Sequence, residues 1–392
     1  MSIEIFQFDN KNKKMLKEFV KFPWDLYRDD DNWVPSLNME LLGNKLFKAV
    51  GLLTHEHPFH EHSEVVYFIA KKNNKIVGRI AAIKNNMHIE FHNEKAGFFG
   101  FFEVIDDFEI AKLLFDRAGE WLKSKGLTIM RGPANFSSNG SWGLLVQNFD
   151  DYPMIFTPYN KKYYENLILQ YGFKKKMDLL GMLMPVQDNT EEDKKRRERL
   201  ERISEKVKQK HGIVVRPIKL DKKNFKKETE YIYQIYQNAW GKNWGFVPIT
   251  KHEFDDIAIG MQALLRPGLA SIAFVNDEPS AFIVNLPDIN EFIKKKKSIF
   301  GNSDIIRLIR FLKNRKKNKR IHLLLLGIVE KYRKIGLDSV LFIESFKNAQ
   351  PMGFEQCEIS WLLETNELVI RHAEAMNGKE YKRWRIFEYE LK

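Results

Sequence analysis

The sequence lacks the features that stabilise most small secreted proteins or hold proteins in membranes. Its 392 residues include one cysteine, Cys357, so no disulfide can form within the chain. No uncharged apolar run approaches the ~18 residues that a membrane span requires, and the opening residues MSIEIFQFDNKNKK have no apolar signal-peptide core. These absences predict a soluble cytoplasmic protein with no membrane span, in which Cys357 is a small buried thiol.

The sequence also lacks a recognisable metal-binding motif. Four histidines cluster at positions 55, 57, 60 and 62, and clustered imidazoles can bind zinc. Pro58 prevents a regular helix through this cluster, and no cysteine or matching carboxylate motif follows it. We therefore expect no metal, and we expect these histidines to lie in a loop.

Length and composition indicate two domains. A chain of 392 residues exceeds the size at which one core usually keeps growing, and a hydrophobic fraction of 44% with 30 phenylalanines can supply two cores. The net charge of +12 favours phosphorylated or polyanionic partners. Nucleic acid is therefore an alternative partner, although a lysine-rich composition also arises from genome bias.

The two halves of the chain predict the same order of secondary structure elements. In each half the pattern predicts a strand, a helical region, a hairpin, a strand–helix–strand segment, a further helix and a closing strand. The predicted strands are 2–8, 65–70, 76–83, 97–104, 127–131 and 179–184, then 213–218, 270–275, 281–286, 322–328, 356–363 and 381–391. The sequence therefore predicts two similar α/β (α+β) folds in tandem, with mixed, mostly antiparallel sheets flanked by helices.

A charged segment, 188–212, separates the two halves. Its apolar residues Leu200, Ile203 and Val207 stand at helical spacing, which indicates a solvated helical linker with one narrow contact face. We therefore expect domains at 1–187 and 213–392.

An insertion at 290–320 interrupts the second half. It carries lysines at 294–297, an apolar helical run at 305–312 and a basic stretch at 313–320. A basic amphipathic helix can lie on a membrane surface or on a polyanion. The alternative is a helix packed on its own domain and followed by a solvated lysine tail.

A candidate phosphate site lies between His322 and Asn366. A buried strand leads through a turn with Arg333 and Gly336 into a helix at 337–350. Such a turn directs free backbone N–H groups and the positive end of the helix dipole at one point. The sequence therefore predicts a phosphate cradle here.

This segment resembles the acyl-CoA-binding core of the GNAT superfamily of N-acetyltransferases. Arg333 and Gly336 match the family's Arg/Gln-x-x-Gly turn, which binds the pyrophosphate of coenzyme A, and the flanking strands separate in the family to admit the pantetheine arm. The resemblance implies acyl-CoA, in the first instance acetyl-CoA, as co-substrate, bound by Ile328, Arg333, Lys334, Ile335, Gly336 and Leu337. Asp338 departs from the family's Gly or Ala, and its carboxylate would repel a diphosphate unless it points away.

The first half resembles a second, divergent copy of the GNAT fold. The strand 97–104 runs directly into Asp106 and Asp107 without an Arg-x-x-Gly turn, which implies that this copy does not hold coenzyme A in the usual way. In double GNAT-like folds such a copy helps to shape the acceptor site. The runs GRIAAI, GFFGFFE, RGPAN and YKRWRIFE also resemble a group of bacterial tandem acetyltransferase-like proteins.

The loop 131–143 is a candidate acceptor-binding loop. It is rich in Asn, Ser and Gly and longer than a simple connection needs, although the same composition also makes ordinary turns. Together with the aromatic residues that follow it, the loop supplies the substrate-binding candidates Asn135, Ser138, Asn139 and Tyr159.

Neither copy has the tyrosine that often supplies the general acid in the family. The first copy has Ile168 at that position, and the second has His372 and Glu374 in the corresponding helix. Acyl transfer to an amine needs both a base and an acid, so this absence weakens the implied chemistry.

Three polar residues at strand ends are the catalytic candidates. Glu364 and Asn366 end the fifth strand of the second copy, and Glu103 ends the fourth strand of the first. Structural alternatives remain open, with Asn366 as a helix cap and Glu103 as the partner of Arg79 or Arg131 in an ion pair.

The resemblance implies an acyl-CoA-dependent N-acyltransferase acting on an unidentified amine, a small molecule or a peptide. One alternative is a non-catalytic binding or regulatory protein on a degenerate GNAT scaffold, which could bind nucleic acid through its lysine runs. Another is aminoacyl transfer from a charged tRNA. A steep salt dependence of DNA affinity would distinguish the nucleic-acid role.

Overall fold

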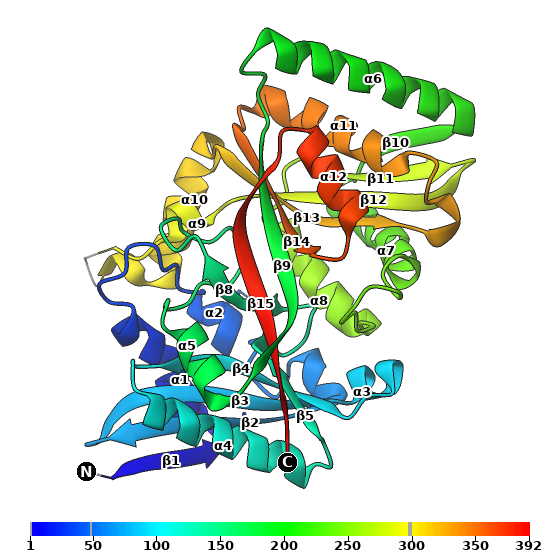
Figure 1. The fold of residues 1–392 in the computed structure, drawn as a ribbon. Coiled ribbons are helices and arrows are strands. Elements are labelled where there is room, and N and C mark those ends of the chain that lie inside the picture. Colours follow the sequence, from blue (N-terminus) through cyan, green and yellow to red (C-terminus); the bar gives the residue numbers. More distant parts are fainter. Residues whose placement is uncertain (1, 48, 297–299) are drawn as a thin grey trace. The chain divides into compact units, whose positions relative to one another are not determined.

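The structure is a computed structural model, and it describes residues 2–47, 49–296 and 300–392 (Figure 1). The chain forms two compact units. Unit 1 comprises Met1–Leu179, Asn290–Lys313 and Lys382–Lys392, and unit 2 comprises Leu180–Ile289 and Asn314–Tyr381. Residues 290–313 and 382–392 thus belong to unit 1 although they come from the second half of the sequence. The domain ranges expected from the sequence, 1–187 and 213–392, do not include this exchange. Lys297 of the expected lysine run lies outside the described residues.

Unit 1 is built on a mixed sheet. Its strands are β1 (Ile3–Phe8), β2 (Ser63–Lys72), β3 (Lys75–Asn85), β4 (Ala96–Val104), β5 (Ile129–Gly132), β8 (Leu144–Gln147) and the second part of β15 (Lys379–Glu390), with a small ribbon of β6 (Ala134–Asn135) and β7 (Ser141–Trp142). Neighbours from β1 to β4 are antiparallel, β5 is parallel to β4, and β15 is antiparallel to β5 and β8.

Helices cover both faces of this sheet. They are α1 (Lys13–Leu26), α2 (Asn38–Leu42), α3 (Asn86–His92), α4 (Phe108–Ser124), α5 (Tyr164–Tyr171), α9 (Asn290–Ile293) and α10 (Asp304–Asn314). Helix α4 is the crossover that the parallel pair β4–β5 requires. Ile80 and Phe99 belong to the core under α4, whereas Tyr67 on β2 packs against Phe19 of α1 on the other face, as the period of two along a strand dictates.

Unit 2 repeats this plan. Its strands are β10 (Ile213–Pro217), β11 (Ala270–Val275), β12 (Glu278–Pro287), β13 (Arg320–Ile328), β14 (Gln356–Leu363) and the end of β9 (Lys174–Pro185), which lies next to β14. Neighbours from β10 to β13 are antiparallel and β14 is parallel to β13. Its helices are α6 (Glu191–His211), α7 (Lys222–Ala239), α8 (Lys251–Gln262), α11 (Leu337–Ala349) and α12 (Glu367–Ala375).

The two faces of the unit 2 sheet carry different helices. Helix α11 provides the crossover from β13 to β14, and its Leu341 shares a buried core with Ala281 and Ile283 of β12. Phe282, between those two residues, faces the other way and contacts Trp240 at the end of α7. The structure therefore confirms a mixed, mostly antiparallel arrangement of strands flanked by helices, and the order β10-β11-β12-β13-β14-β9 of unit 2 repeats the order β1-β2-β3-β4-β5-β15 of unit 1 (Figure 1).

Helix starts agree with the sequence where a capping side chain marks them. Asp107, rather than Asp106, caps α4, and Thr190 caps the charged helix α6. The order of elements that the sequence predicts does not include α3 or α8. Within the described ranges, no helix is both long enough and apolar enough to cross a bilayer.

Candidate functional site

The two parallel strands of unit 2 separate halfway along their length. β13 and β14 pair only from Arg320 to Leu323 on one strand and from Gln356 to Ile359 on the other, yet β13 continues to Ile328 and β14 to Leu363. The pairing of β13 with β12 shifts by one residue at Leu324, which is a β-bulge. The bulge therefore lies where the strands begin to separate.

The residues after this bulge are less covered than their place in the sheet predicts. Leu324, Leu325 and Leu326 are only half-buried, although β13 lies between β12 and β14. An interior strand normally has both faces and both edges covered, so the separation from β14 leaves this apolar stretch open to a ligand of matching chemistry.

The turn after β13 presents the start of α11 without a side-chain cap. Gly336 is the N-cap residue, with a φ of 85° that favours glycine. Helices α1, α4, α6, α7 and α8 are each capped by an Asn, Asp or Thr side chain, whereas no side chain caps α11. Apart from the N–H groups of Asp338 and Ser339, which face the Asp338 carboxylate, the first N–H groups of α11 have no side-chain cap, and such a cradle can bind phosphate.

Arg333 has a structural contact that the sequence does not reveal. Its guanidinium donates to the carbonyl oxygen of Ala239, the last residue of α7, where a cation complements the helix dipole. Of the other predicted cofactor residues, Leu337 is buried in the core, Ile335 and Ile328 are half-buried and pack against that core, and Lys334 is exposed with a φ of 70°. The cradle is thus chiefly backbone.

Asp338 points to a histidine rather than standing alone. His372 of α12 lies with Nδ1 2.8 Å from Oδ2 of Asp338. Burial raises the pKa of Asp338, but His372 and the N–H of Ser339 outweigh it and hold that pKa below its ordinary value. In turn, Asp338 raises the pKa of His372. The carboxylate that departs from the family's turn is therefore paired with a histidine that is 34 positions away in the sequence.

Unit 1 has the same strand separation, but its own chain fills it. β4 and β5 pair only from Ala96 to Phe98, and a bulge follows at Phe101, which has a φ of 50°. The N–H of Phe101 donates to Oδ1 of Asn135 at 2.7 Å. A Cβ added at Gly100 would lie 1.9 Å from the carbonyl oxygen of Ala134, so the loop lies directly against the strand.

The predicted substrate-binding residues have mostly internal contacts. Asn135 binds Phe101, the N–H of Asn139 donates to Oγ of Ser137, and the hydroxyl of Tyr159 lies 3.2 Å from both Asp30 and the carbonyl of Phe149. Ser138 lies in the same loop. Asn135 thus fills the space between β4 and β5 where these strands of unit 1 separate. A loop composition rich in turn residues does not by itself predict this role.

Glu103 lies in a buried polar cluster of unit 1. The hydroxyls of Tyr27 and Tyr164 both donate to its Oε2 at 2.7 Å, and Arg79 lies 4.0 Å from Oε1. Burial raises the pKa of Glu103. Arg131, the other expected partner, binds Glu94 and Glu388 instead. The two tyrosines were missed because neither stands near Glu103 in the sequence.

Glu364 and Asn366 lie at the end of β14, where the strands of unit 2 have separated. Both are half-buried. Asn366 is the N-cap residue of α12, but its side chain makes no capping hydrogen bond. The amide is therefore not committed to the helix start, as the structural alternative would require.

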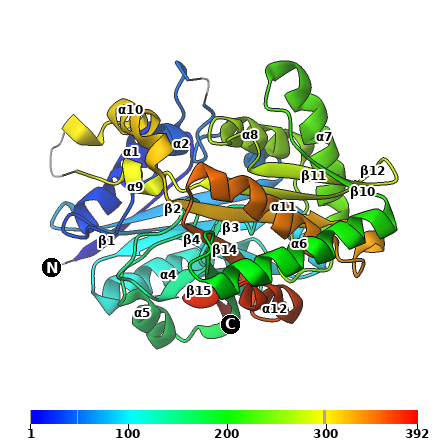
Figure 2. The same ribbon diagram turned by 90° about the horizontal axis from the view of Figure 1, so that it is seen from above.

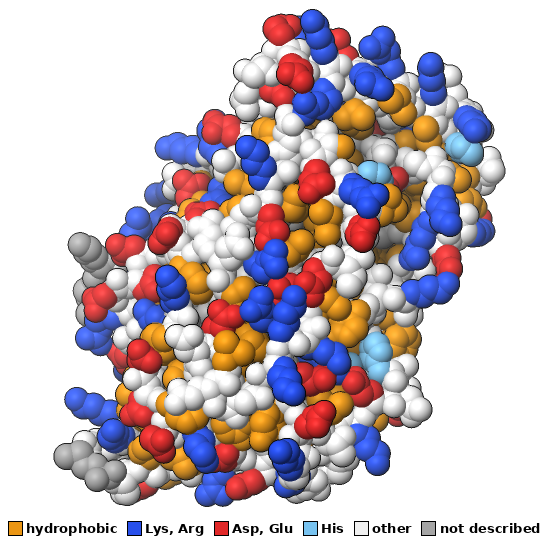
Figure 3. Space-filling view, in the orientation of Figure 1, with side chains coloured by type: hydrophobic (Ala, Val, Ile, Leu, Met, Phe, Trp, Pro, Cys, Tyr) orange, Lys and Arg blue, Asp and Glu red, His pale blue; other side chains and the backbone are white. Residues whose placement is uncertain are grey.

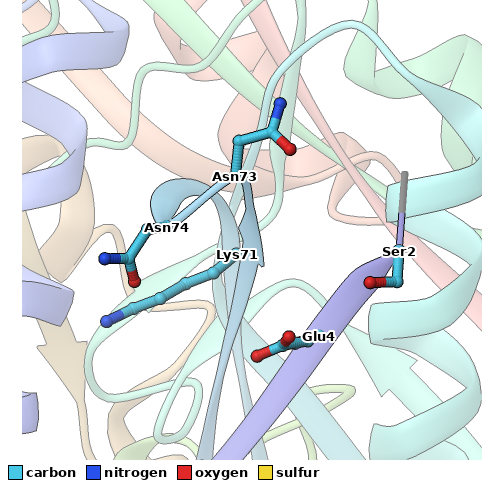
Figure 4. A pocket seen from close by; sticks show the side chains of 5 residues that line it. All are labelled: Ser2, Glu4, Lys71, Asn73 and Asn74. Carbon is cyan, nitrogen blue, oxygen red and sulfur yellow. The ribbon is translucent and has the colours of Figure 1, made fainter.

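Two surface hollows lie elsewhere. One is lined by Ser2, Glu4, Lys71, Asn73 and Asn74 beside the turn between β2 and β3 (Figure 4). The other lies in unit 2 at the C-terminal end of α11, the end away from Gly336, and includes Arg197 and Lys347. None of the predicted site residues lines either hollow. Among the described residues, no group of three or more His, Cys, Asp or Glu side chains could hold a metal.

Comparisons with known proteins agree with this duplicated architecture. No protein-family model matches the sequence. The chain is 33% identical to Protein YghO of Escherichia coli over 97% of this chain and 94% of that protein. It is 29% identical to the bacterial ceramide synthase of Caulobacter vibrioides over 97% of this chain and 96% of that protein.

Solved structures extend the comparison to the fold. A tandem GNAT protein from the clavulanic acid biosynthesis pathway matches with a TM-score of 0.57 and 8% identity, covering 100% of this chain and 99% of that chain. At this identity the match speaks to fold alone. This chain therefore belongs to the family that includes Protein YghO, and its fold is that of a tandem GNAT protein.

Proposed function

We propose that this protein is an acyl-CoA-dependent N-acyltransferase whose cofactor site lies in unit 2. One observation carries the proposal: the separation of β13 from β14 after Leu323 leads to the uncapped start of α11 at Gly336. An acyl-CoA needs an apolar channel for its pantetheine arm and N–H donors for its diphosphate. In support, unit 2 has half-buried leucines where β13 and β14 separate and a helix start without a side-chain cap, whereas Asn135 fills the corresponding place in unit 1.

The relatives support an amide-forming reaction. The tandem fold is that of GNAT proteins, and the similarity to the ceramide synthase extends over nearly the whole of both chains. Ceramide is the N-acyl amide of a long-chain amine, so a protein of that name joins an acyl group to nitrogen. We infer an amine as the acceptor class here, with its identity left to experiment.

The proposed residues have separate tasks. N–H groups of the first turn of α11 would hold the diphosphate, and Leu324 to Leu326 would contact the pantetheine arm. Transfer forms a C–N bond to the amine and breaks the C–S bond of the thioester, so the amine loses a proton and the thiolate gains one. Glu364 and Asn366 follow the end of β14, on the side where β14 has separated from β13. They are therefore our candidates to receive the proton of the amine and to orient it.

The alternative of a polyanion-binding protein has less support. On the face drawn in Figure 3, Lys and Arg side chains alternate with Asp and Glu rather than forming one continuous basic surface. Several cations of the chain are paired, as Arg197 is with Asp188 and Lys208 with Glu344. Such a surface does not favour nucleic acid over other anions.

Hydrogen exchange should locate the cofactor. With acetyl-CoA or a longer acyl-CoA present, amide exchange should slow at 324–326 and at 336–340, because these N–H groups would be covered or bonded. Exchange at 98–103 should not change, since Asn135 already occupies that position. Protection in unit 1, or in neither unit, would contradict the proposal, and release of free thiol on adding long-chain and short-chain amines would extend it to catalysis.

Affinity for acyl-CoA should fall as pH rises through the pKa of His372. Asp338 raises that pKa, so His372 stays charged to a pH above the ordinary value of about 6.5. Below a pH of about 6.5, protonated His372 offsets the negative charge of Asp338. Above the raised pKa the cation is lost and Asp338 repels the diphosphate. Calorimetric titration across this range measures the change.

The variant Asp338→Asn is the matched control for this titration. It removes the carboxylate, so the part of the pH dependence that comes from His372 should largely disappear and affinity should remain high at alkaline pH. An unchanged pH profile in Asp338→Asn would mean that the pair lies away from the bound phosphate.

A further inference from the structure

Helix α10, from the insertion, is fixed to unit 1 by one face. Arg307 is fully buried and donates to the carbonyl oxygens of Ile293, Pro35 and Ser36. Asp304 accepts from the N–H groups of Asn38 and Met39 at 3.0 and 2.7 Å, so it caps α2. These contacts hold the helix in one orientation on the unit.

The opposite face of α10 is apolar and exposed. Ile305, Ile306, Ile309 and Leu312 recur at helical spacing on this face, and each is 41–55% exposed. Phe311, on the inner face, is buried. A helix that buries an arginine and exposes a stripe of isoleucine is organised for contact with something outside its own unit.

A second apolar projection follows α2. An isolated bridge joins Asn44 to Ala49 just after α2, and residues 44–47 project from the ribbon beside α2 (Figure 2). Leu46 is 81% exposed, and Phe47 and Val50 are also exposed. Asp304 ties α10 to the start of α2, and these residues follow the end of α2 in the same unit. The exposed apolar side chains of α10 together with Leu46, Phe47 and Val50 are here called the α10 surface.

The charge of the α10 surface is of one sign. Residues 300–317 contain a single carboxylate, Asp304, and it is committed to α2. Residues 43–50 contain none. Lys45 and Lys313, which adjoin Leu46 and Leu312 in the sequence, are exposed, and so is Lys296. Apolar side chains surrounded by lysines are complementary to an anionic lipid bilayer, which offers headgroup phosphates above a hydrocarbon interior.

We propose that the α10 surface docks on an anionic membrane, with α10 lying in the plane of the interface and Leu46 and Phe47 entering the headgroup region. Docking of this kind needs no membrane-spanning helix, and it does not rest on the proposed acyl transfer. It would bring the protein to acyl chains or amines that reside in lipid.

Sedimentation with vesicles tests the proposal on the full-length protein. Vesicles of phosphatidylglycerol and phosphatidylcholine should carry the protein down at low salt, and vesicles of phosphatidylcholine alone should carry much less. The double variant Ile309→Ser, Leu312→Ser should lower the partition coefficient at least about tenfold, since each lost side chain removes apolar area from the interface. Leu46→Ser should lower it by a smaller factor.

Leu169→Ser is the matched control, because Leu169 is similarly exposed on α5 of the same unit. It should bind vesicles as the unchanged protein does, and thermal melting should show that all variants remain folded. Absence of binding to anionic vesicles, or equal binding by the double variant, would overturn the proposal. So would a dimer in gel filtration that Ile309→Ser dissociates, since the surface would then be covered by a second copy.

Discussion

Replacing Ser339 by glutamate should weaken acyl-CoA binding roughly thirtyfold, or about 2 kcal/mol, while leaving the fold intact. Ser339 is half-buried in the first turn of α11, directly after Asp338. A carboxylate in the first turn favours the helix dipole, so the free energy of unfolding should change by less than about 0.5 kcal/mol. The same carboxylate lies where the proposed cradle receives a diphosphate, and it would repel that group.

The neutral variant Ser339→Gln separates charge from size. It has nearly the same shape as the glutamate variant, so it should retain most of the affinity if repulsion is the cause. Titration calorimetry with acetyl-CoA measures binding, and urea unfolding measures stability. Equal loss of affinity in both variants would mean that the larger side chain blocks the site sterically. Full affinity in both variants would mean that acyl-CoA does not bind at the start of α11.

Replacing Glu103 by leucine should destabilise unit 1 by about 3–5 kcal/mol. The change leaves Arg79 without its carboxylate partner and the hydroxyls of Tyr27 and Tyr164 without their shared acceptor. Arg79 is almost completely buried and would keep its hydrogen bond to the carbonyl oxygen of Phe19 and its contact with the Phe19 ring, neither of which neutralises its charge. Unpaired buried polar groups cost far more than the added apolar contact returns. Urea unfolding of the purified variant measures this loss.

Glu103→Gln distinguishes a structural carboxylate from a catalytic one. The amide oxygen can still accept from the two tyrosines, so stability should fall much less than with leucine. If Glu103 only holds the fold together, the glutamine variant should keep near-normal turnover. A loss of 10²-fold or more in kcat with stability retained would identify Glu103 as a general base.

The order of elements could be predicted from sequence because it depends on local patterns. Alternating strands such as β1, glycine stops such as Gly172 and capping residues such as Thr190 act within a few positions. The turn at Gly336 could be found for the same reason, since a left-handed residue before an apolar helix is a local requirement. The duplication could be predicted by comparing the order of secondary structure elements in the two halves of the chain.

The contacts of the site could not be predicted, because they join residues far apart in the sequence. Asp338 meets His372, and Phe101 meets Asn135, only once two strands are in register and their helices are packed. Tyr27 reaches Glu103 across 76 positions. Burial of Arg307 beneath an apolar outer face also contradicts the usual pattern, in which the apolar side of a helix faces the core.

The way the two units share the chain sets a limit on how the protein is made. The chain passes between units after residues 179, 289, 313 and 381, and residues 387–390 complete the pairing of β5. During synthesis, unit 2 has all its residues once position 381 has left the ribosome, but the sheet of unit 1 lacks a strand until residues 382–390 have also been made. The half that is made first is therefore the half that finishes folding last, and a fragment that stops at the charged helix α6 should leave the edge of β5 open to aggregation.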